Sequence, residues 1–459
     1  MNKWIDILAY FFCFLFTAAG ILVSLNRFWQ YEVFYYDFGI FDQAIWNVSR
    51  LKAPIIDHLV VSGKWIFADH FNPSIFLFSP LYWFTDKSEI ILIAQAVVVG
   101  LSGLILYLIG LRILKSHFLS FSVLCCYLFF IGIQNAVISD FHEVTASTFF
   151  IALAFWGIIY KKKLLYFTMF FLTLGFKESN FLLGIGIGVF ILLAQKEWRK
   201  IATATIIISI VWGLTSIYFI IPYFANGIYQ YSHNTSGTNY ITVFFDDSIK
   251  RNTLLYTFYS FGFLPLFSPS FWALIFQDLF IRFAPQAPTR WGLGLHYSAQ
   301  LAVITTLSSI YAIKFLKEKS IFFRKYIYLF ALILIFNSFY LYHFVLHGPF
   351  ALSYNKVFYA HSNDFEFLTK IIKKVPQNAV IMTQNNLASH FTHQKVWLLR
   401  SNYSDYNPDY ILIDNRKGQS INNFFVSPPN ISDMIEKLKK EKKYKLIYYT
   451  KEQFLFKKV

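Results

Sequence analysis

The chain has 459 residues, of which 56% are hydrophobic, 21% are aromatic and only 14% are charged. A soluble domain carries about 25% charged residues, so a water-soluble fold of this composition would expose a large apolar surface. The net charge of +16 would suit nucleic-acid binding in a soluble protein. Here long apolar runs separate the charges, which excludes that partner class and indicates an integral membrane protein.

Apolar segments predict about eleven transmembrane helices, because a membrane helix needs about 20 mostly apolar residues. The predicted helices lie at about 5–26, 88–112, 117–135, 144–160, 164–176, 179–195, 200–223, 253–267, 270–283, 297–315 and 325–344. Pro265 and Pro269 separate two of the short segments, which therefore form either a broken helix or a tight hairpin.

Basic residues in the short connections predict the orientation. They are Arg112 and Lys115, Lys161 to Lys163, Lys196 with Arg199 and Lys200, and a last group from Lys314 to Lys325. With eleven helices all four groups fall on one side, which the positive-inside rule assigns to the cytoplasm. We therefore expect a multi-pass protein of the plasma (inner) membrane, with a cytoplasmic N-terminus and an extracytoplasmic C-terminus.

Two domains are expected. Residues 1–345 form a transmembrane core with a long first outer loop at 27–87, and residues 346–459 form a small extracytoplasmic α/β domain. In the second domain, Asn363 and Glu366 fit a capping box that opens a helix to about Val375, and Asn430 can cap another helix through Lys442. Short apolar runs at 379–383, 396–399, 410–413 and 444–449 predict strands between them.

Candidate site residues gather at the predicted outer ends of the helices, where ionisable groups near a membrane are costly and usually functional. They are Asp37, Asp42, Asp69, His70, Asp140, His142, Lys177, Glu178, Arg282, Arg290, His296 and Tyr297. A carboxylate among them can serve as a general base, and the cations can hold a lipid-linked phosphate.

Each candidate also has a structural interpretation. Asp37 and Asp42 fit the caps of a loop helix, and Lys177 with Glu178 fits a solvated pair of loop charges. The histidines His70, His142 and His296 fit satisfied structural positions better than a metal site, since their spacing matches no metal motif. Arg282 and Arg290 fit anchors for lipid headgroups.

Several of these residues lie in segments that resemble a known family. The segments are Tyr36 to Trp46 (YDFGIFDQAIW), His70 to Pro73 (HFNP), Asp140 to His142 (DFH), Lys177-Glu178, Gly294 to Ser298 (GLHYS), Gln384 to Leu387 (QNNL) and Asp409 to Asp414 (DYILID). The chain from about 30 to 415 thereby resembles a prokaryotic family of membrane proteins, domain of unknown function 2079, which is grouped with the GT-C superfamily of membrane glycosyltransferases.

The resemblance implies a GT-C-like helical core and a sugar donor carried on a polyprenyl phosphate. It also implies transfer on the outer face with inversion of the anomeric centre. GT-C relatives carry an Asp, often followed by Glu, just after the first helix; Asp37 occupies that place, and Phe38 follows it. Asp42 or Asp69 can supply the second carboxylate, and the use of a divalent cation is left open.

The leading hypothesis is therefore an inverting glycosyltransferase whose partners are a polyprenyl-phosphate-linked sugar, membrane lipid and a glycan, lipid or protein acceptor. Asp37 is the expected base, with Asp42 beside it. Lys177, Arg282 and Arg290 are expected to hold the donor phosphate. The remaining candidates are expected to line the substrate site. A transporter or lipid flippase, and a non-catalytic membrane receptor or scaffold, are the alternatives.

Overall fold

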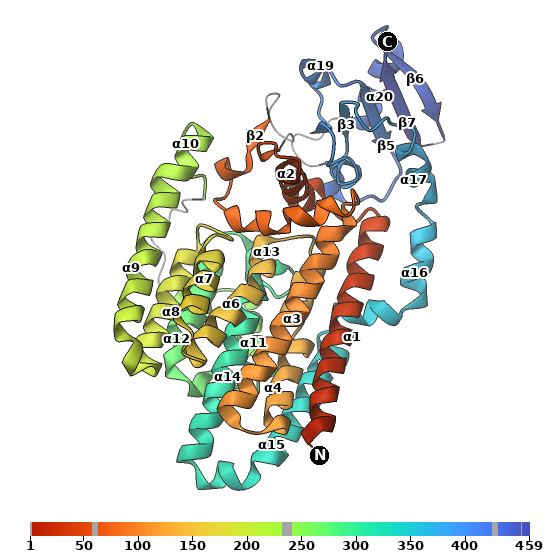
Figure 1. The fold of residues 1–459 in the computed structure, drawn as a ribbon. Coiled ribbons are helices and arrows are strands. Elements are labelled where there is room, and N and C mark those ends of the chain that lie inside the picture. Colours follow the sequence, from red (N-terminus) through yellow and green to blue (C-terminus); the bar gives the residue numbers. More distant parts are fainter. Residues whose placement is uncertain (1, 57–62, 232–240, 425–429, 451) are drawn as a thin grey trace. The chain divides into compact units, whose positions relative to one another are not determined.

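The computed structural model describes the whole chain except residues 1, 57–62, 232–240, 425–429 and 451 (Figure 1). The chain forms two compact units. The helical unit contains residues 1–23, 70–74 and 93–354, and the mixed unit contains residues 24–69, 75–92 and 355–459. Most of the expected first outer loop therefore belongs to the same compact unit as the C-terminal region.

The helical unit is built from the helices that the apolar pattern predicts. Five of them, α3, α6, α7, α8 and α12, begin and end within two residues of the predicted positions. The helices are α1 (Asn2–Trp29), α3 (Glu89–Leu114), α4 (His117–Phe129), α5 (Ile131–Ile138), α6 (Glu143–Ile159), α7 (Lys163–Leu174), α8 (Asn180–Ala194), α9 (Arg199–Thr215), α10 (Ile221–Ala225), α11 (Ser248–Ser260), α12 (Trp272–Phe283), α13 (Pro288–Trp291), α14 (Ala299–Lys319) and α15 (Ile321–Tyr340).

Fewer of these helices than predicted are long enough to cross a bilayer. Within the described residues, five continuous helical segments have the length and apolar character of a span. They are Lys3–Trp29, Glu89–Leu114, Lys196–Ala225, His296–Lys319 and Ile321–Val345. The predicted helix at 117–135 is instead the pair α4 and α5, bent by 49°, which would make a sixth span.

The expectation of eleven full spans is not met by length and composition. Helices α6, α7 and α8 are apolar but have only 17, 12 and 15 residues. At 1.5 Å per residue, a helix of 12 residues extends about 18 Å, whereas the hydrocarbon core is about 30 Å thick. The apolar pattern located these helices at nearly their observed lengths, and the prediction of eleven spans counted them as full spans although they are short.

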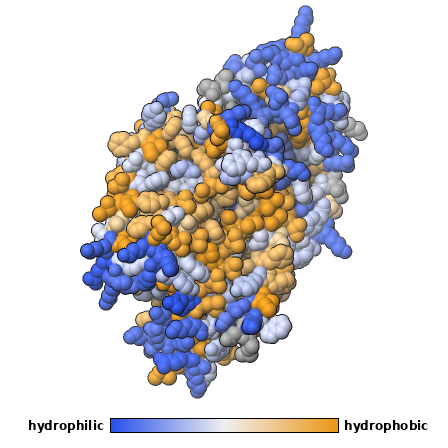
Figure 2. All heavy atoms as spheres, in the orientation of Figure 1, coloured by the Kyte–Doolittle hydropathy of each residue, from blue (hydrophilic) through white to orange (hydrophobic). Residues whose placement is uncertain are grey.

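Burial separates the centre of the helical unit from its surface. The segment of α14 is 78% buried, whereas the segment that contains α9 is only 28% buried. On α9 the side chains of Ile207, Val211 and Leu214 are exposed. Figure 2 shows an apolar surface over the middle of the helical unit, with hydrophilic residues at helix ends. A surface of this kind is stable when lipid covers it.

A five-stranded sheet organises the C-terminal part of the mixed unit, with the strand order β4-β3-β5-β7-β6. The strands are β3 (Ile381–Thr383), β4 (Val396–Leu398), β5 (Tyr410–Asp414), β6 (Tyr444–Tyr449) and β7 (Gln453–Lys458). Strands β3, β4 and β5 run parallel and are buried throughout, as expected of apolar strands that are covered on both faces. Strand β7 was not predicted.

Helix α20 (Ile431–Lys440) packs on this sheet through Met434, Ile435 and Leu438. The predicted cap is confirmed, because the Asn430 side chain accepts a hydrogen bond from the Asp433 amide at 3.4 Å. The predicted capping box upstream is wrong. Helix α17 (Glu366–Ile372) has Phe365 at its N-cap, which supplies no side-chain hydrogen bond.

The N-terminal part of the mixed unit is a series of short elements. These are the π-helical turn η1 (Tyr35–Gly39), helix α2 (Ile40–Ser49), the hairpin of β1 (Ile55–Ile56) with β2 (Lys64–Trp65), and the extended 3-10 segment η3 (Pro73–Trp83), which begins in the helical unit. The remaining helices are α16 (Lys356–Asn363), α18 (Asn385–Ala388) and α19 (Tyr403–Tyr406). Helix α2 contributes buried residues at seven of its ten positions, including Asp42.

Candidate functional site

A cluster of paired charges forms where two tight turns of the helical unit come together. One turn precedes α6 and supplies Glu143, and the other joins α7 to α8 and supplies Lys177 and Glu178. Carboxylates are favourable at helix N-termini, where the helix dipole and unpaired amides attract negative charge. Glu143 is the first residue of α6, and Glu178 lies two residues before α8, so both carboxylates benefit from this effect.

The segment from His70 to Ser74 is fixed on the second of these turns. The Ser74 amide donates to the Gly175 carbonyl at 2.8 Å, and the Phe71 amide donates to Glu178 Oε2 at 3.2 Å. A Cβ atom at Gly175 would lie 2.3 Å from Ser74 Oγ, so a larger residue there would force the Ser74 hydroxyl to move. This backbone pairing places His70 beside the α7–α8 turn.

The side chains then form an ion pair and an adjoining histidine–carboxylate contact. We call this group the buried charge cluster: His70, Glu143, Lys177, Glu178 and Tyr229. Lys177 Nζ lies 2.7 Å from Glu143 Oε1, and His70 Nδ1 lies 2.9 Å from Glu178 Oε1. The Tyr229 hydroxyl donates to the same Glu178 oxygen at 2.7 Å. Both carboxylate side chains are only 1% exposed.

Electrostatic partners keep Glu178 and Lys177 of the cluster ionised. Burial by itself raises the pKa of Glu178, but His70 and Lys177 outweigh it and lower that pKa to about 2. Burial likewise opposes the charged form of Lys177, yet the charges of Glu143 and Glu178 raise the pKa of Lys177 above its ordinary value. At neutral pH the cluster therefore holds charged groups that are largely shielded from water.

Some buried polar atoms around the cluster lack partners within the described residues. They are both side-chain amide atoms of Asn72, which is 0% exposed, and Glu143 Oε2. Native structures seldom leave buried polar groups unpaired, and such groups mark places where water, an ion or a polar ligand binds. Asn72 and Glu143 therefore each present a buried polar atom to which water or another polar group can bond.

A second group of candidates lies where the α5–α6 turn meets the start of α14. The His142 and His296 rings stack with centroids 3.5 Å apart, and Tyr297 lies 4.0 Å from His296. Gln95 holds the turn, because it accepts from the His142 amide at 2.8 Å and donates to the Asp140 carbonyl at 2.6 Å. Asp140 itself is buried in a left-handed conformation with φ of 57°, which fits a role in shaping the turn.

Arg282 and Arg290 make different contacts in the loop between α12 and α14. Arg282 is 4% exposed and donates to the carbonyl oxygens of Arg290 at 3.1 Å and Gly292 at 2.8 Å, with Asp278 3.6 Å away. These bonds favour a role in holding the loop. The guanidinium of Arg290 is half-buried and lies 6.0 Å from the Tyr297 ring centroid.

In the mixed unit, Asp42 is fully buried and surrounded by donors. It accepts hydrogen bonds from the hydroxyls of Tyr82 and Thr392, and His393 Nε2 lies 3.2 Å from it. Burial and the charge of Asp42 raise the pKa of Tyr82 well above its ordinary value. The arrangement favours a structural role for Asp42, joining helix α2 and the segment η3 to the residues after β3.

Asp37 and Asp69 are placed differently from Asp42. Both are half-buried, Asp37 lies on the π-helical turn η1, and Lys64 Nζ is 3.9 Å from Asp69. Burial and then the charges of Asp69 and Asp37 raise the pKa of Tyr36, so both carboxylates act on one phenol. Within the described residues, no group of three His, Cys, Asp or Glu side chains has the arrangement of a metal site.

Sequence reasoning missed some members of these sites. Glu143 follows directly after the Asp140-Phe141-His142 motif, so its position in a motif of charged residues was the available signal. Tyr229 lies in a long aromatic-rich connection that carries no such signal. Lys250 was also missed; it is 0% exposed, pairs with Asp246 at 2.9 Å, and its Nζ lies 4.1 Å from the centroid of the Trp291 ring in the loop that Arg282 holds.

The fold and its apolar surface define a multi-pass helical membrane protein that carries a small α/β region. The chain belongs to the family described as predicted membrane protein (DUF2079), whose pattern matches residues 27–454. That match includes most of both units and every candidate site residue. No curated protein matches the chain.

Proposed function

We propose that this protein is a membrane glycosyltransferase that uses a sugar on a polyprenyl phosphate and inverts the anomeric centre. The observation that carries the proposal is the placement of Asp37: a partly accessible carboxylate on an irregular turn soon after the first apolar helix, with Asp69 acting on the same tyrosine. π-Helical turns occur frequently at functional sites. Asp42, which is saturated by internal donors, is assigned a positioning role.

In the proposed reaction, the Asp37 carboxylate takes the proton of an acceptor hydroxyl. The acceptor oxygen forms a bond to the anomeric carbon, and the bond from that carbon to the phosphate oxygen breaks on the opposite face. Polyprenyl phosphate leaves with the bonding electrons, and the proton remains on Asp37. Lys177 and Arg290 are the cations proposed to stabilise the leaving phosphate, and His296 and Tyr297 are proposed to line the site.

The proposed arrangement has the short helices α6, α7 and α8, and the segments around α11 and α12, crossing or entering the membrane beside the longer spans, as in a GT-C-like core. The site residues are assigned to the outer face, and the basic helix ends to the cytoplasm. The buried charge cluster supports this assignment, because it lies at the ends of apolar helices, where an amphipathic donor can present its phosphate without leaving the bilayer.

Transport is the second candidate function. Buried ion pairs in a membrane protein are typical of substrate or proton paths. The cluster lies at helix ends, however, whereas transporter sites lie near the middle of the bilayer. This position favours the enzyme.

The test is the profile of polyprenyl-phosphate sugars and envelope glycans in cells that lack the gene and are complemented with variants. Asp37→Asn should leave the sugar missing from the glycan and the lipid-linked donor accumulated, while its thermal midpoint in detergent stays native. Asp364→Asn is the matched control, because that carboxylate is 69% exposed and pairs only with His361 among the described residues. Full transfer by Asp37→Asn would refute the assignment of the base.

A further inference from the structure

A basic hollow lies at the end of the helical unit that is remote from the buried charge cluster along α6 and α14. It has a volume of about 850 Å³ and lies among the C-terminal ends of α3, α6, α8 and α14 and the start of α15. Five basic side chains line it, namely Arg112, Lys115, Lys314, Lys317 and Arg324, and Glu318 is the acidic residue in its wall.

The charges of this hollow are not balanced inside the protein. Within the described part of the chain, Arg112, Lys115, Lys314 and Lys317 form no ion pair with an acidic side chain. Arg324 donates to the carbonyl oxygens of Lys317 at 2.9 Å and Glu318 at 3.2 Å, so it caps the end of α14. Like charges gathered around one hollow repel each other, and an anion bound there would relieve that repulsion.

The floor and walls of the hollow add neutral features. Tyr311 lines it and is fixed by ring contacts to Phe190 and Phe271, with centroids 5.4 and 5.3 Å away. Gln195 also lines it, with its amide nitrogen 3.5 Å from the Tyr311 hydroxyl. Ile113, Leu114 and Ile159 provide apolar walls. Hydroxyl and amide donors next to apolar walls suit a ligand that is both polar and lipid-like.

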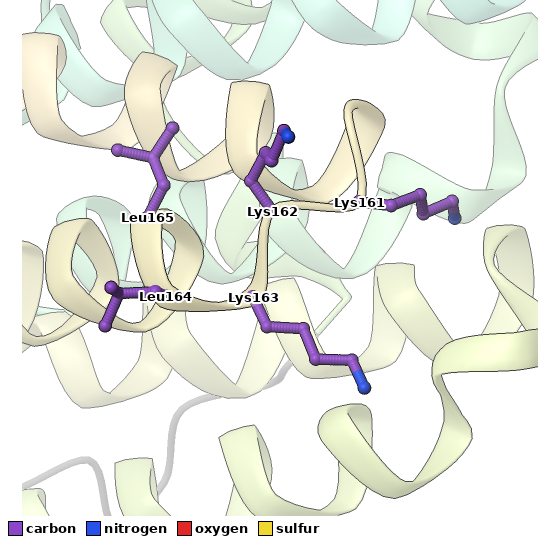
Figure 3. A pocket seen from close by; sticks show the side chains of 5 residues that line it. All are labelled: Lys161, Lys162, Lys163, Leu164 and Leu165. Atoms are coloured by element: carbon purple, nitrogen blue, oxygen red, sulfur yellow. The ribbon is translucent and has the colours of Figure 1, made fainter.

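A general excess of lysine at one side of a membrane does not by itself create such a site. A second hollow of about 550 Å³, lined by Lys161, Lys162, Lys163, Leu164 and Leu165, shows the difference. Figure 3 shows the three lysine side chains extending in different directions, and Lys161 is paired with Glu197. In that hollow the cations diverge, whereas in the larger one basic residues from α3, α14 and α15 surround one space.

We propose that the basic hollow between α3, α14 and α15 binds the phosphate of an anionic phospholipid headgroup. Basic pockets between membrane helices recognise such headgroups. A lipid is favoured over free phosphate because the hollow lies among the ends of membrane helices and has apolar walls. This site is separate from the proposed glycosyl-transfer site and does not depend on it.

The test uses the full-length protein in a neutral detergent, with native mass spectrometry to measure binding of phosphatidylglycerol, phosphatidylcholine and inorganic phosphate. The double variant Lys314→Gln/Lys317→Gln should weaken phosphatidylglycerol binding roughly thirtyfold, since each of the two basic residues near a headgroup contributes about 1 kcal/mol and about 1.4 kcal/mol corresponds to a tenfold change. The matched control is Lys162→Gln/Lys163→Gln, which removes the same charge from the other hollow and should bind as the native protein does.

If millimolar inorganic phosphate competes with phosphatidylglycerol on the native protein but not on the Lys314→Gln/Lys317→Gln variant, the site takes free phosphate. That result would overturn the lipid assignment. Equal weakening in both double variants, or none in either, would overturn the site itself. Thermal midpoints without lipid check that the variants fold. If the Lys314→Gln/Lys317→Gln protein does not fold, Arg112→Gln, at the exposed end of α3, serves as the test with the same expected direction.

Discussion

Lysine side chains at the two ends of the helical unit differ in burial and in ion pairing. At the start of α6, Lys177 has a side chain only 20% exposed and meets Glu143 at 2.7 Å. Near the end of α14, Lys314 is exposed and Lys317 half-buried, and neither has an acidic partner among the described residues. Removing a charge from water is costly unless an opposite charge compensates, whereas a hydrated charge needs no partner. The comparison teaches that burial, more than residue type, decides which charges the fold depends on.

The largest expected effect is the loss of the ion pair at the first end. Lys177→Met keeps the length of the side chain but leaves Glu143 buried without its cation, which should destabilise the protein by about 3 kcal/mol. The measurement is the thermal midpoint in detergent, compared with Lys314→Met at the other end, where we expect a change within about 0.5 kcal/mol.

The double variant Glu143→Leu/Lys177→Met is the control for this experiment. It removes both charges, so it should recover much of the stability lost in Lys177→Met. Equal midpoints for Lys177→Met and Lys314→Met would contradict the idea that the two ends differ.

The mixed unit contains the same contrast in two carboxylates of one segment. Asp42 is fully buried and receives three donors, while Asp37 is half-buried. Asp42→Asn should therefore destabilise the protein by about 2 kcal/mol, because it replaces a buried oxygen that accepts a hydrogen bond with an amide group that donates. Asp37→Asn should leave stability almost unchanged and remove activity. If the Asp42→Asn protein is as stable as the native protein, burial of a carboxylate does not predict how much the stability of the fold depends on it.

Lowering the pH should reduce the stability that Glu178 contributes, in contrast to the contribution of the exposed charges. Its pKa is lowered from 4.5 to about 2, so the stability that it contributes is present above pH 4.5 and is lost as the pH falls from 4.5 towards 2. His70→Gln removes the first of the charges that lower this pKa. The midpoint of that variant should therefore fall less between pH 5 and pH 3 than the native midpoint, by an amount on the order of 1 kcal/mol.

The control for the acid experiment is His361→Gln, which removes an exposed histidine 2.9 Å from Asp364. Its acid profile should match that of the native protein. If His70→Gln also follows the native profile, the His70–Glu178 pair does not hold the carboxylate in its ionised form.

The sequence predicted the helix positions well because apolar periodicity and composition are local properties. It overestimated the number of full spans because it counted short apolar segments as spans: α6, α7 and α8 have 17, 12 and 15 residues, close to their predicted lengths, whereas a span needs about 20. It also missed the break at Phe130 between α4 and α5. Strand β7 was missed because Gln453 and the two final lysines interrupt its apolar run, and pairing with β5 and β6 is what fixes it.

For the candidate site, the sequence identified the residue types and the turns but not the pairing. The motifs brought His70, Lys177 and Glu178 to attention, and the structure brings these three together with Glu143 and Tyr229. Nothing local distinguishes Asp37 from Asp42, since both follow aromatic residues in one segment. Only the fold shows that residues 350 positions later, Thr392 and His393, saturate Asp42.

The smallest expected effect belongs to the lysines between α6 and α7. Figure 3 shows Lys162 and Lys163 extending away from each other, and neither has an ion-pair partner in the described ranges. Lys162→Gln/Lys163→Gln should therefore change the free energy of unfolding by no more than about 0.5 kcal/mol, as exposed substitutions usually do. The measurement is the thermal midpoint in detergent at low and high salt, because the relief of repulsion between exposed cations is larger at low salt. A loss of several kcal/mol would show that these exposed lysines contribute as much stability as the buried Lys177. Burial would then not explain which charges of the helical unit the fold depends on.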